Sequence, residues 1–172
     1  AQGDSYTTRH EYAQGLWKVS EREFRGFGVV KVIDADGNYS KTWFEQNDDF
    51  KKGRINVQES YDDSDRRLTR VENTWVAQEI TPGSGIEFVS LSESKNFLYR
   101  EDLSFKQTKT DYQYDSYGNI FTVVSFGDVD DTGDDQAVST EYVYNPAVWL
   151  MSTPRVTMTY DSQWQRVRMA WF

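Results

Sequence analysis

The stretch 111–135, DYQYDSYGNIFTVVSFGDVDDTGDD, predicts a strand, a tight turn, a second strand and an acidic loop. Tyr112 and Tyr114 alternate with polar residues, which is the two-residue period of a strand. Asp115 and Gly118 occupy the first and fourth positions of a type I turn. The aspartate side chain caps such a turn, and the glycine adopts the positive φ that lets the chain reverse. We therefore expect a β-hairpin with Asp115 and Gly118 as structural turn residues and Tyr114 as a packed aromatic.

The same pattern occurs earlier in the chain. Residues 33–39 (IDADGNY) match residues 114–120 (YDSYGNI) in character at every position: apolar, Asp, two variable residues, Gly, Asn, apolar. Asp34 and Gly37 are therefore predicted to form an equivalent structural turn. A repeated hairpin of this kind indicates a repeat architecture.

Two weaker copies lack the glycine. They begin at Tyr61 (YDDSDRRLTR) and Tyr160 (YDSQWQRVR), and Asp65 and Trp164 stand where the glycine would be. Residues with a Cβ atom seldom adopt a positive φ. These two turns are therefore expected to differ in geometry from the glycine-containing ones.

Most of the remaining sequence also predicts strands. Residues 68–80 fit a helical spacing as well, but their Thr, Val and Trp content favours a strand. Separate strands are expected at 86–91 and 96–105. The Gly-Phe-Gly at 26–28 indicates a bulge or a close strand crossing rather than a nucleotide loop, because no third glycine and no helix follow it.

One short helical turn is predicted near 146–151. Asn145 is a suitable N-cap, and Pro146 suits the first helical position. Trp149 and Leu150 would be its buried anchors, which makes Trp149 a structural aromatic. The predicted fold class is all-β, an antiparallel hairpin-repeat sheet, over a single domain, 1–172, that is a fragment of a longer chain.

Composition limits the possible partners. The 19 basic and 28 acidic residues give a formal charge of −9, which argues against nucleic acid as a partner. The absence of cysteine excludes disulfides, thiolate metal ligands and a thiol nucleophile. No apolar run approaches the ~20 residues of a membrane-spanning helix.

The sequence gives poor support for catalysis. His10 is the single histidine, so no histidine pair for zinc exists. Ser84 lies in Pro-Gly-Ser-Gly, which is not the Gly-x-Ser-x-Gly of a nucleophile elbow. We expect the protein not to be an enzyme.

The acidic loop 127–135 offers a single candidate metal site, and otherwise we expect no cofactor. Hard carboxylate oxygens suit calcium. Position twelve counted from Asp128 is Ser139, however, where an EF-hand requires a glutamate. A solvated acidic turn therefore stays the alternative, and calorimetric titration with Asp130→Ala as control separates the two. The candidate calcium ligands are Asp128, Asp130, Asp131 and Asp134.

Five segments, spread over most of the chain, resemble the RHS or YD-repeat family. The resemblance is strongest to the B component of bacterial insecticidal toxin complexes (SpvB/TcdB-like). The segments are 21–28 (EREFRGFG), 34–44 (DADGNYSKTWF), 70–75 (RVENTW), 112–135 and 141–155 (EYVYNPAVWLMSTPR). In that family the repeats form a β-sheet ribbon that spirals into a shell around a toxic C-terminal segment. The resemblance implies an exported bacterial protein, secreted or on the cell surface, in which this chain is a non-catalytic part of the shell wall.

The resemblance has limits. The chain is much shorter than a whole shell, and we find no β-propeller, no aspartyl self-cleavage segment and no toxin region in it. The implied partners are the rest of a longer RHS-type chain and its enclosed toxin segment. Unpaired strand edges could also cause self-association.

A second function is compatible with the composition. The chain could be a compact β-domain that binds carbohydrate or a protein partner through exposed Tyr and Trp side chains. Our favoured expectation is that these aromatics line a packed face of the sheet instead. An exposed aromatic platform on a compact monomer would favour the binding domain.

Overall fold

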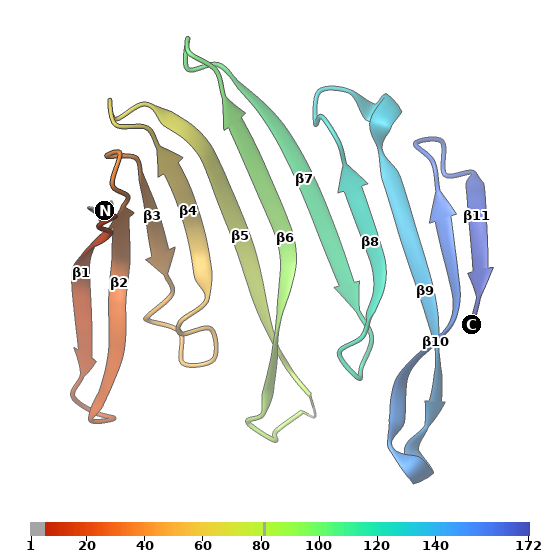
Figure 1. Ribbon diagram of the computed structural model, residues 1–172. Coiled ribbons are helices and arrows are strands. Elements are labelled where there is room, and N and C mark those ends of the chain that lie inside the picture. The colour runs from red at the N-terminus through yellow and green to blue at the C-terminus, as the bar shows by residue number, and fades with distance from the viewer. Residues whose placement is uncertain (1–5, 81) are drawn as a thin grey trace, which may run out of the picture. The chain divides into compact units, whose positions relative to one another are not determined.

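A computed structural model describes residues 6–80 and 82–172. The strands form one antiparallel sheet whose spatial order follows the sequence (Figure 1). The strands are β1 (Arg9–Lys18), β2 (Glu23–Ile33), β3 (Tyr39–Phe44), β4 (Ile55–Tyr61), β5 (Arg67–Glu79), β6 (Glu87–Tyr99), β7 (Phe105–Tyr114), β8 (Ile120–Phe126), β9 (Gln136–Asn145), β10 (Leu150–Tyr160) and β11 (Arg166–Trp171). Two 3-10 turns, η1 (Thr132–Asp134) and η2 (Pro146–Val148), complete the structure of the described residues. The all-β hairpin fold predicted from the sequence is confirmed.

The chain divides into two compact units. Unit 1 comprises the described residues up to Trp75 together with Asn96–Lys106, and unit 2 comprises Val76–Lys95 and Gln107–Phe172. The long strands β5 and β6 each contribute to both units.

The strand boundaries differ from expectation around residues 86–105. The structure has a single strand, β6, where two strands were predicted, and a tight turn at Arg100–Ser104 where we expected the second strand to continue. The polar run 92–95 does not interrupt β6. Lys95 and Glu93 lie two apart in this strand, and their side chains form an ion pair of 2.9 Å. In a sheet with solvated faces, charged residues can occupy the middle of a strand, so polarity alone did not mark a loop.

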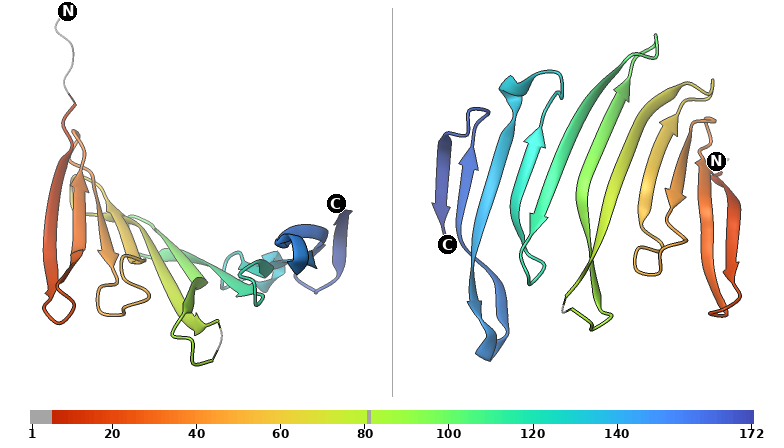
Figure 2. Two further views of the ribbon diagram at one scale, coloured as in Figure 1. Left: turned by 90° about the horizontal axis from the view of Figure 1, so that it is seen from below. Right: turned by 180° about the vertical axis from the view of Figure 1, so that it is seen from behind.

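Few side chains of the described residues are buried. They are Arg25, Glu59, Ala137 and Val156. Two views of the ribbon show that within each unit the described residues supply no second layer of helices or strands (Figure 2). A strand points successive side chains to opposite faces, so each unit presents both faces of its sheet with little of its own chain to cover them.

The expectation that the aromatics line a packed face is wrong for four of the six tryptophans. Trp17, Trp149, Trp164 and Trp171 are exposed. The physical reason is the absence of a second layer, because a single sheet offers no enclosed interior for a large ring.

A bulge at the glycines of β2 is confirmed. Gly15 pairs with Phe27 and Trp17 with Phe24, so β2 contains one residue more than β1 over this interval. Gly26 has a φ of +81°, which glycine adopts at little cost. The side chain of Arg25, directly before Gly26, is only 1% exposed.

A short helical turn exists at Pro146, but its anchors are not buried. η2 is a single 3-10 turn, and the Asn145 side chain forms no cap hydrogen bond. Trp149 ends the turn with a left-handed φ of 55°, and its side chain is 86% exposed. Leu150 is 41% exposed and already belongs to β10. The turn lies at the tip of the β9–β10 hairpin, beyond the end of β8, where no neighbouring strand can cover it (Figure 1).

Candidate functional site: aspartate turns and a buried arginine

The two predicted glycine turns have the expected geometry. In the first, the Asp34 carboxylate accepts hydrogen bonds from the backbone N–H of Asp36 (2.9 Å) and the side-chain amide of Asn38 (3.1 Å). In the second, Asp115 accepts from the backbone N–H groups of Tyr117 and Asn119 at 2.8 and 2.9 Å. Each aspartate therefore replaces the hydrogen bonds that the backbone lacks at the reversal.

The turns without glycine have the same geometry, so the expectation of a different geometry is wrong. The backbone N–H of Asp62 donates to the carbonyl of Arg66, and that of Asp161 donates to the carbonyl of Gln165, at 3.0 Å in each case. Each aspartate side chain also accepts from two backbone N–H groups. The fourth residues, Asp65 and Trp164, adopt left-handed φ values of 62° and 60°. The hydrogen bonds of the turn outweigh the cost of the left-handed conformation, which is about 1–2 kcal/mol.

A fifth turn of this type was missed in the sequence. Arg100 donates its N–H to Ser104 (2.8 Å), and Leu103 occupies the left-handed position with a φ of 64°. Its aspartate, Asp102, stands third in the turn and accepts from the N–H and hydroxyl of Ser104. Neither the first-position aspartate nor the glycine is present. The remaining signal was the Arg-Glu-Asp run between two alternating apolar segments.

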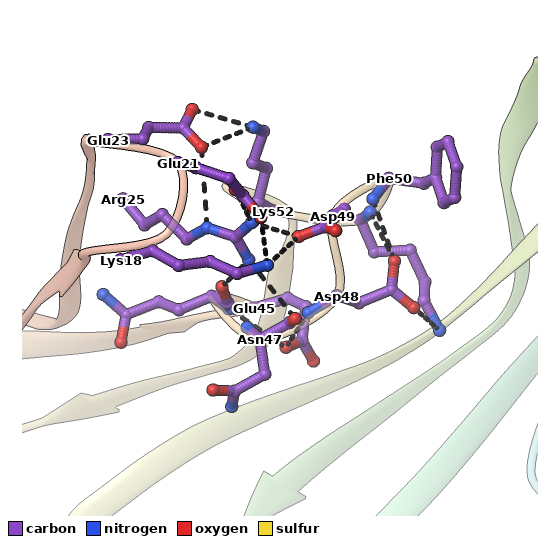
Figure 3. Close-up of polar contacts among 12 residues, drawn as sticks. Lys18, Glu21, Glu23, Arg25, Glu45, Asn47, Asp48, Asp49, Phe50 and Lys52 are labelled. Atoms are coloured by element: carbon purple, nitrogen blue, oxygen red, sulfur yellow. Dashed lines mark hydrogen bonds and ion pairs between the residues drawn. The ribbon is translucent and has the colours of Figure 1, made fainter.

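The most constrained site of unit 1 surrounds the Arg25 guanidinium. It lies between the loop that joins β1 to β2 and the loop 45–54 that joins β3 to β4 (Figure 3). Nη1 donates to the backbone carbonyls of Gln46 (2.8 Å) and Asn47 (3.3 Å). Nη2 donates to the carboxylates of Glu21 (2.5 Å) and Asp49. One buried cation therefore ties two loops to each other through both backbone and side chains.

Further ion pairs surround the arginine. Lys18 Nζ lies 2.8 Å from Asp49 and also contacts Glu21. Lys52 Nζ lies 2.7 Å from Glu23, whose other oxygen is 3.5 Å from Arg25 Nε. Three cations and three carboxylates thus balance each other. Hydrogen bonds from Lys18 and then Arg25 lower the pKa of Asp49 to about 2, and those from Asp49 and Glu21 raise the pKa of Lys18.

The loop 45–54 is held by its own carboxylates. Glu45 Oε1 accepts from the backbone N–H groups of Gln46, Asn47 and Asp48 at 2.8–3.3 Å. Asp48 accepts from the N–H of Phe50 and of Lys51, at 3.0 Å in each case. These hydrogen bonds hold the loop in a conformation in which the carbonyls of residues 46 and 47 accept from Arg25. The sequence did predict a polar loop here, but it gave no indication of this role.

Glu59 is the second buried charge of unit 1. Its carboxylate accepts from the Tyr61 hydroxyl (2.5 Å) and from Arg70 Nη1 (2.5 Å), and it lies 3.3 Å from Arg67 Nη2. The side chain is 3% exposed. Arg70 also contacts Glu72 at 2.6 Å, so the group spans β4 and β5. Sequence reasoning found neither Arg25 nor Glu59 as a buried residue. The sequence feature that could have identified them is a charged residue at a position of a strand that shares a face with apolar or aromatic residues.

The candidate calcium ligands do not converge. Asp134 accepts from the backbone N–H of Asp128 (2.9 Å), and Asp131 accepts from that of Gly133 (2.9 Å). Within the described ranges, no group of three or more histidine, aspartate or glutamate side chains is placed to hold a metal ion. These hydrogen bonds favour a solvated acidic turn, and calcium binding stays a prediction.

Tyr114 is a half-buried packing residue of unit 2. Its hydroxyl donates to the Leu91 carbonyl at 3.1 Å, and its ring meets Phe88 edge-on with centroids 5.6 Å apart. Phe88 also lies against Gly118, where an added Cβ would come within 3.1 Å of the ring. Tyr114 therefore connects the body of the sheet with the turn that follows it.

Comparison with known proteins shows which family the first third of the chain resembles. Residues 1–58 match the family model described as the insecticide toxin TcdB middle/N-terminal region, and this range contains the whole Arg25 site. Over these residues the chain is similar to TcdB-like insecticidal toxin components. The resemblance drawn from the sequence is therefore confirmed. A search of curated proteins gives no match.

Solved structures of toxin-complex proteins share the fold of this chain. A crystal structure of TcdB2-TccC3 without its hypervariable C-terminal region superposes with a TM-score of 0.71 at 18% identity. A Photorhabdus luminescens Tc holotoxin pore gives 0.72 at 17%, and a TcdB2-TccC3-Cdc42 structure gives 0.70 at 18%. Each match covers 92% of this chain and 12% of the solved chain. The chain thus spans about one eighth of the length of these proteins.

Proposed function

We propose that the chain forms part of the wall of a shell that encloses a toxic segment in a secreted bacterial toxin-complex protein. The observation that carries this proposal is the sheet itself. Eleven strands run in sequence order, yet the buried side chains of the described residues are Arg25, Glu59, Ala137 and Val156. A compact domain of this length would hide about 70% of the surface of its unfolded chain around a packed core. A sheet without such a core suits a wall of which one face is turned toward other parts of a longer protein.

The regular turns support the same proposal. Five reversals use one hydrogen-bond pattern, and the strands between them pair with their sequence neighbours. A wall extends by repetition of one hairpin unit, so each added hairpin needs contacts only to its neighbours. The partners in this proposal are the remainder of the longer chain and the enclosed toxin segment. The matched structures contain TcdB2 together with TccC3, which supports an assembly of this kind.

We also propose that the segment is not catalytic. Catalytic acids and bases need pKa values near the working pH. In the Arg25 site the pKa of Asp49 is lowered to about 2, and the pKa values of Lys18 and Arg25 are raised. These groups keep their charges at neutral pH and act as fixed ties. The single histidine, His10, is exposed on β1.

A labelling experiment tests the wall. The chain has no cysteine, so single cysteines can be introduced cleanly. Thr122→Cys and Ser125→Cys lie three residues apart in the regular part of β8 and therefore on opposite faces. In the isolated chain both should react with a bulky maleimide at similar rates. In the full-length toxin-complex protein, we expect labelling of one face to be many times slower. Equal rates at the two positions in the full-length protein would contradict enclosure.

A further inference from the structure

Cations and tyrosine rings lie next to one another along one face of unit 1. Lys31 Nζ lies 4.0 Å from the centroid of the Tyr39 ring, and Tyr39 stacks on Tyr61 with centroids 4.6 Å apart. The Arg67 guanidinium follows, 5.7 Å from the Tyr61 ring and 5.3 Å from the Tyr99 ring. Lys41 lies 5.4 Å from both Tyr39 and Tyr61. The cation–tyrosine row consists of Lys31, Lys41, Tyr39, Tyr61, Arg67 and Tyr99.

The strand register produces this row. Tyr39 lies opposite Tyr61, and Tyr61 lies opposite Arg67. Lys31 lies opposite Lys41; Lys41 is two residues from Tyr39, and Lys31 is two residues from Ile33, which lies opposite Tyr39. Positions two apart share a face of the sheet. Side chains from β2, β3, β4 and β5 therefore meet on one side.

In the part of the chain that the structure describes, the two lysines of the row lie near tyrosine rings but form no ion pair. Glu59 lies opposite Lys41, but its carboxylate bonds Tyr61, Arg67 and Arg70 instead. Glu11 lies opposite Lys31, yet it pairs with Arg9 at 2.9 Å. Among the residues that the structure describes, neither lysine has a carboxylate within ion-pair distance. Like charges directly opposite each other on a sheet are destabilising, so an external anion would relieve a repulsion that the fold leaves in place.

A small hollow adjoins the row. Its volume is about 350 Å³, and it is lined by Tyr61, Asp65, Arg67, Tyr99 and Leu103. Two tyrosine rings form its walls, and Arg67 contacts both hydroxyls only at 3.3–3.4 Å. A space of this kind suits an apolar side chain whose neighbouring carboxylates reach the cations.

We propose that the cation–tyrosine row binds an acidic peptide segment of another polypeptide. Carboxylates of that segment would pair with Lys31 and Lys41, and an apolar side chain further along the segment would enter the hollow beside Arg67. The formal charge of the whole chain is −9, so a long polyanion such as nucleic acid would be repelled by the rest of the surface. A short acidic segment can satisfy the row without extending over that surface.

Fluorescence anisotropy tests this proposal. The probe is a labelled acidic peptide with the sequence of residues 127–135, GDVDDTGDD. Its matched control, GNVNNTGNN, has asparagine in place of each aspartate. At low salt (about 20 mM) the chain should bind the acidic peptide, and binding should weaken strongly with added salt. Lys31→Gln combined with Lys41→Gln should weaken it about tenfold, since two ion pairs at half-buried lysines are lost. The charge-matched control, Arg166→Gln with Arg168→Gln in β11, should bind as the parent does.

Several results would overturn the proposal. They are equal binding by the lysine double variant, equal weakening in the arginine control, and equal affinity for the amide peptide. Self-association of the parent chain that the lysine variant abolishes would assign the row to a second copy instead. Loss of fold is excluded by a thermal melt, because removing two facing ammonium groups should leave stability equal or higher.

Discussion

Units 1 and 2 bury opposite kinds of side chain. The buried side chains described in unit 1 are those of Arg25 and Glu59, which are 1% and 3% exposed. In unit 2 they are Ala137 and Val156, which are 4% and 2% exposed. Both units use the same aspartate turns and antiparallel pairing. The two units therefore share a backbone design but differ in what fixes the strands to one another.

The difference has an energetic meaning. A buried charge is stable only while all its partners are present, because removal of one partner leaves an uncompensated charge away from water. Apolar burial is less directional and depends on contact area. Unit 1 should therefore respond sharply to the loss of single polar groups and to acid, and unit 2 to the loss of methyl groups.

The largest effect is expected for a partner of Glu59. Substitution Arg70→Ala leaves the Glu59 carboxylate with the Tyr61 hydroxyl and a long contact to Arg67. Breaking a buried ion pair costs about 3–5 kcal/mol of unfolding free energy. Urea unfolding measures it, and Arg155→Ala is the matched control. A change below that of the control would show that the Glu59 group does not stabilise unit 1.

A smaller effect is expected in unit 2. Val156→Ala removes two methyl groups from the best-buried apolar position and should cost about 2 kcal/mol. Val143→Ala is the matched control, since Val143 is 41% exposed and the change should stay within about 0.5 kcal/mol. Indistinguishable unfolding curves for the two variants would show that apolar burial at Val156 does not stabilise unit 2.

Glycines with a left-handed φ should stabilise both units, and contact with a neighbouring side chain should add to the effect. Gly118→Ala in unit 2 combines a φ of +84° with an approach of 3.1 Å to Phe88, whereas Gly53→Ala in unit 1 has a φ of +80° and open space around the new methyl group. Both variants should lose about 1–2 kcal/mol through the left-handed φ. The additional loss in Gly118→Ala measures the crowding against Phe88, and a smaller loss there than at Gly53 would contradict the described contact.

Acid should weaken unit 1 first. The pKa values of Asp49 and Glu21 are lowered by hydrogen bonds from Lys18 and then Arg25. Because the folded pKa lies below the unfolded one, this stability is present above the unfolded values, about 3.9 and 4.3. It is lost as the pH falls toward about 2. Hydrogen exchange, corrected for the intrinsic rate, should show that β2 and loop 45–54 lose protection before β10. Simultaneous loss, or earlier loss in β10, would show that the Arg25 site does not set the acid response.

Sequence reasoning predicted the parts of this fold that depend on local chemistry. Asp34, Gly37, Asp115 and Gly118 signal turns by themselves, and alternation identifies the strands between them. The turn at Leu103 escaped notice because its left-handed residue is not glycine and its aspartate is displaced. There the neighbouring strands, rather than the turn residue, determine the geometry.

The buried charges could not be predicted in the same way. Arg25 and Glu59 depend on partners that lie 24 and 11 residues away, Asp49 and Arg70, which only the register brings close. The exposure of Trp149 also depends on the register, because it follows from how far the β9–β10 hairpin extends past β8. An isolated tryptophan after proline carries no information about that length.

The heat-capacity change of unfolding tests the central claim most directly. A compact globular chain of 172 residues would show about 2.1–2.6 kcal/mol/K, which follows from 12–15 cal/mol/K per residue. A sheet wall with both faces open buries much less apolar surface. Calorimetry of the isolated chain, at a concentration where sedimentation shows a monomer, should therefore give a value well below this range. A value within the range would contradict the account and favour a compact binding domain with a core of its own.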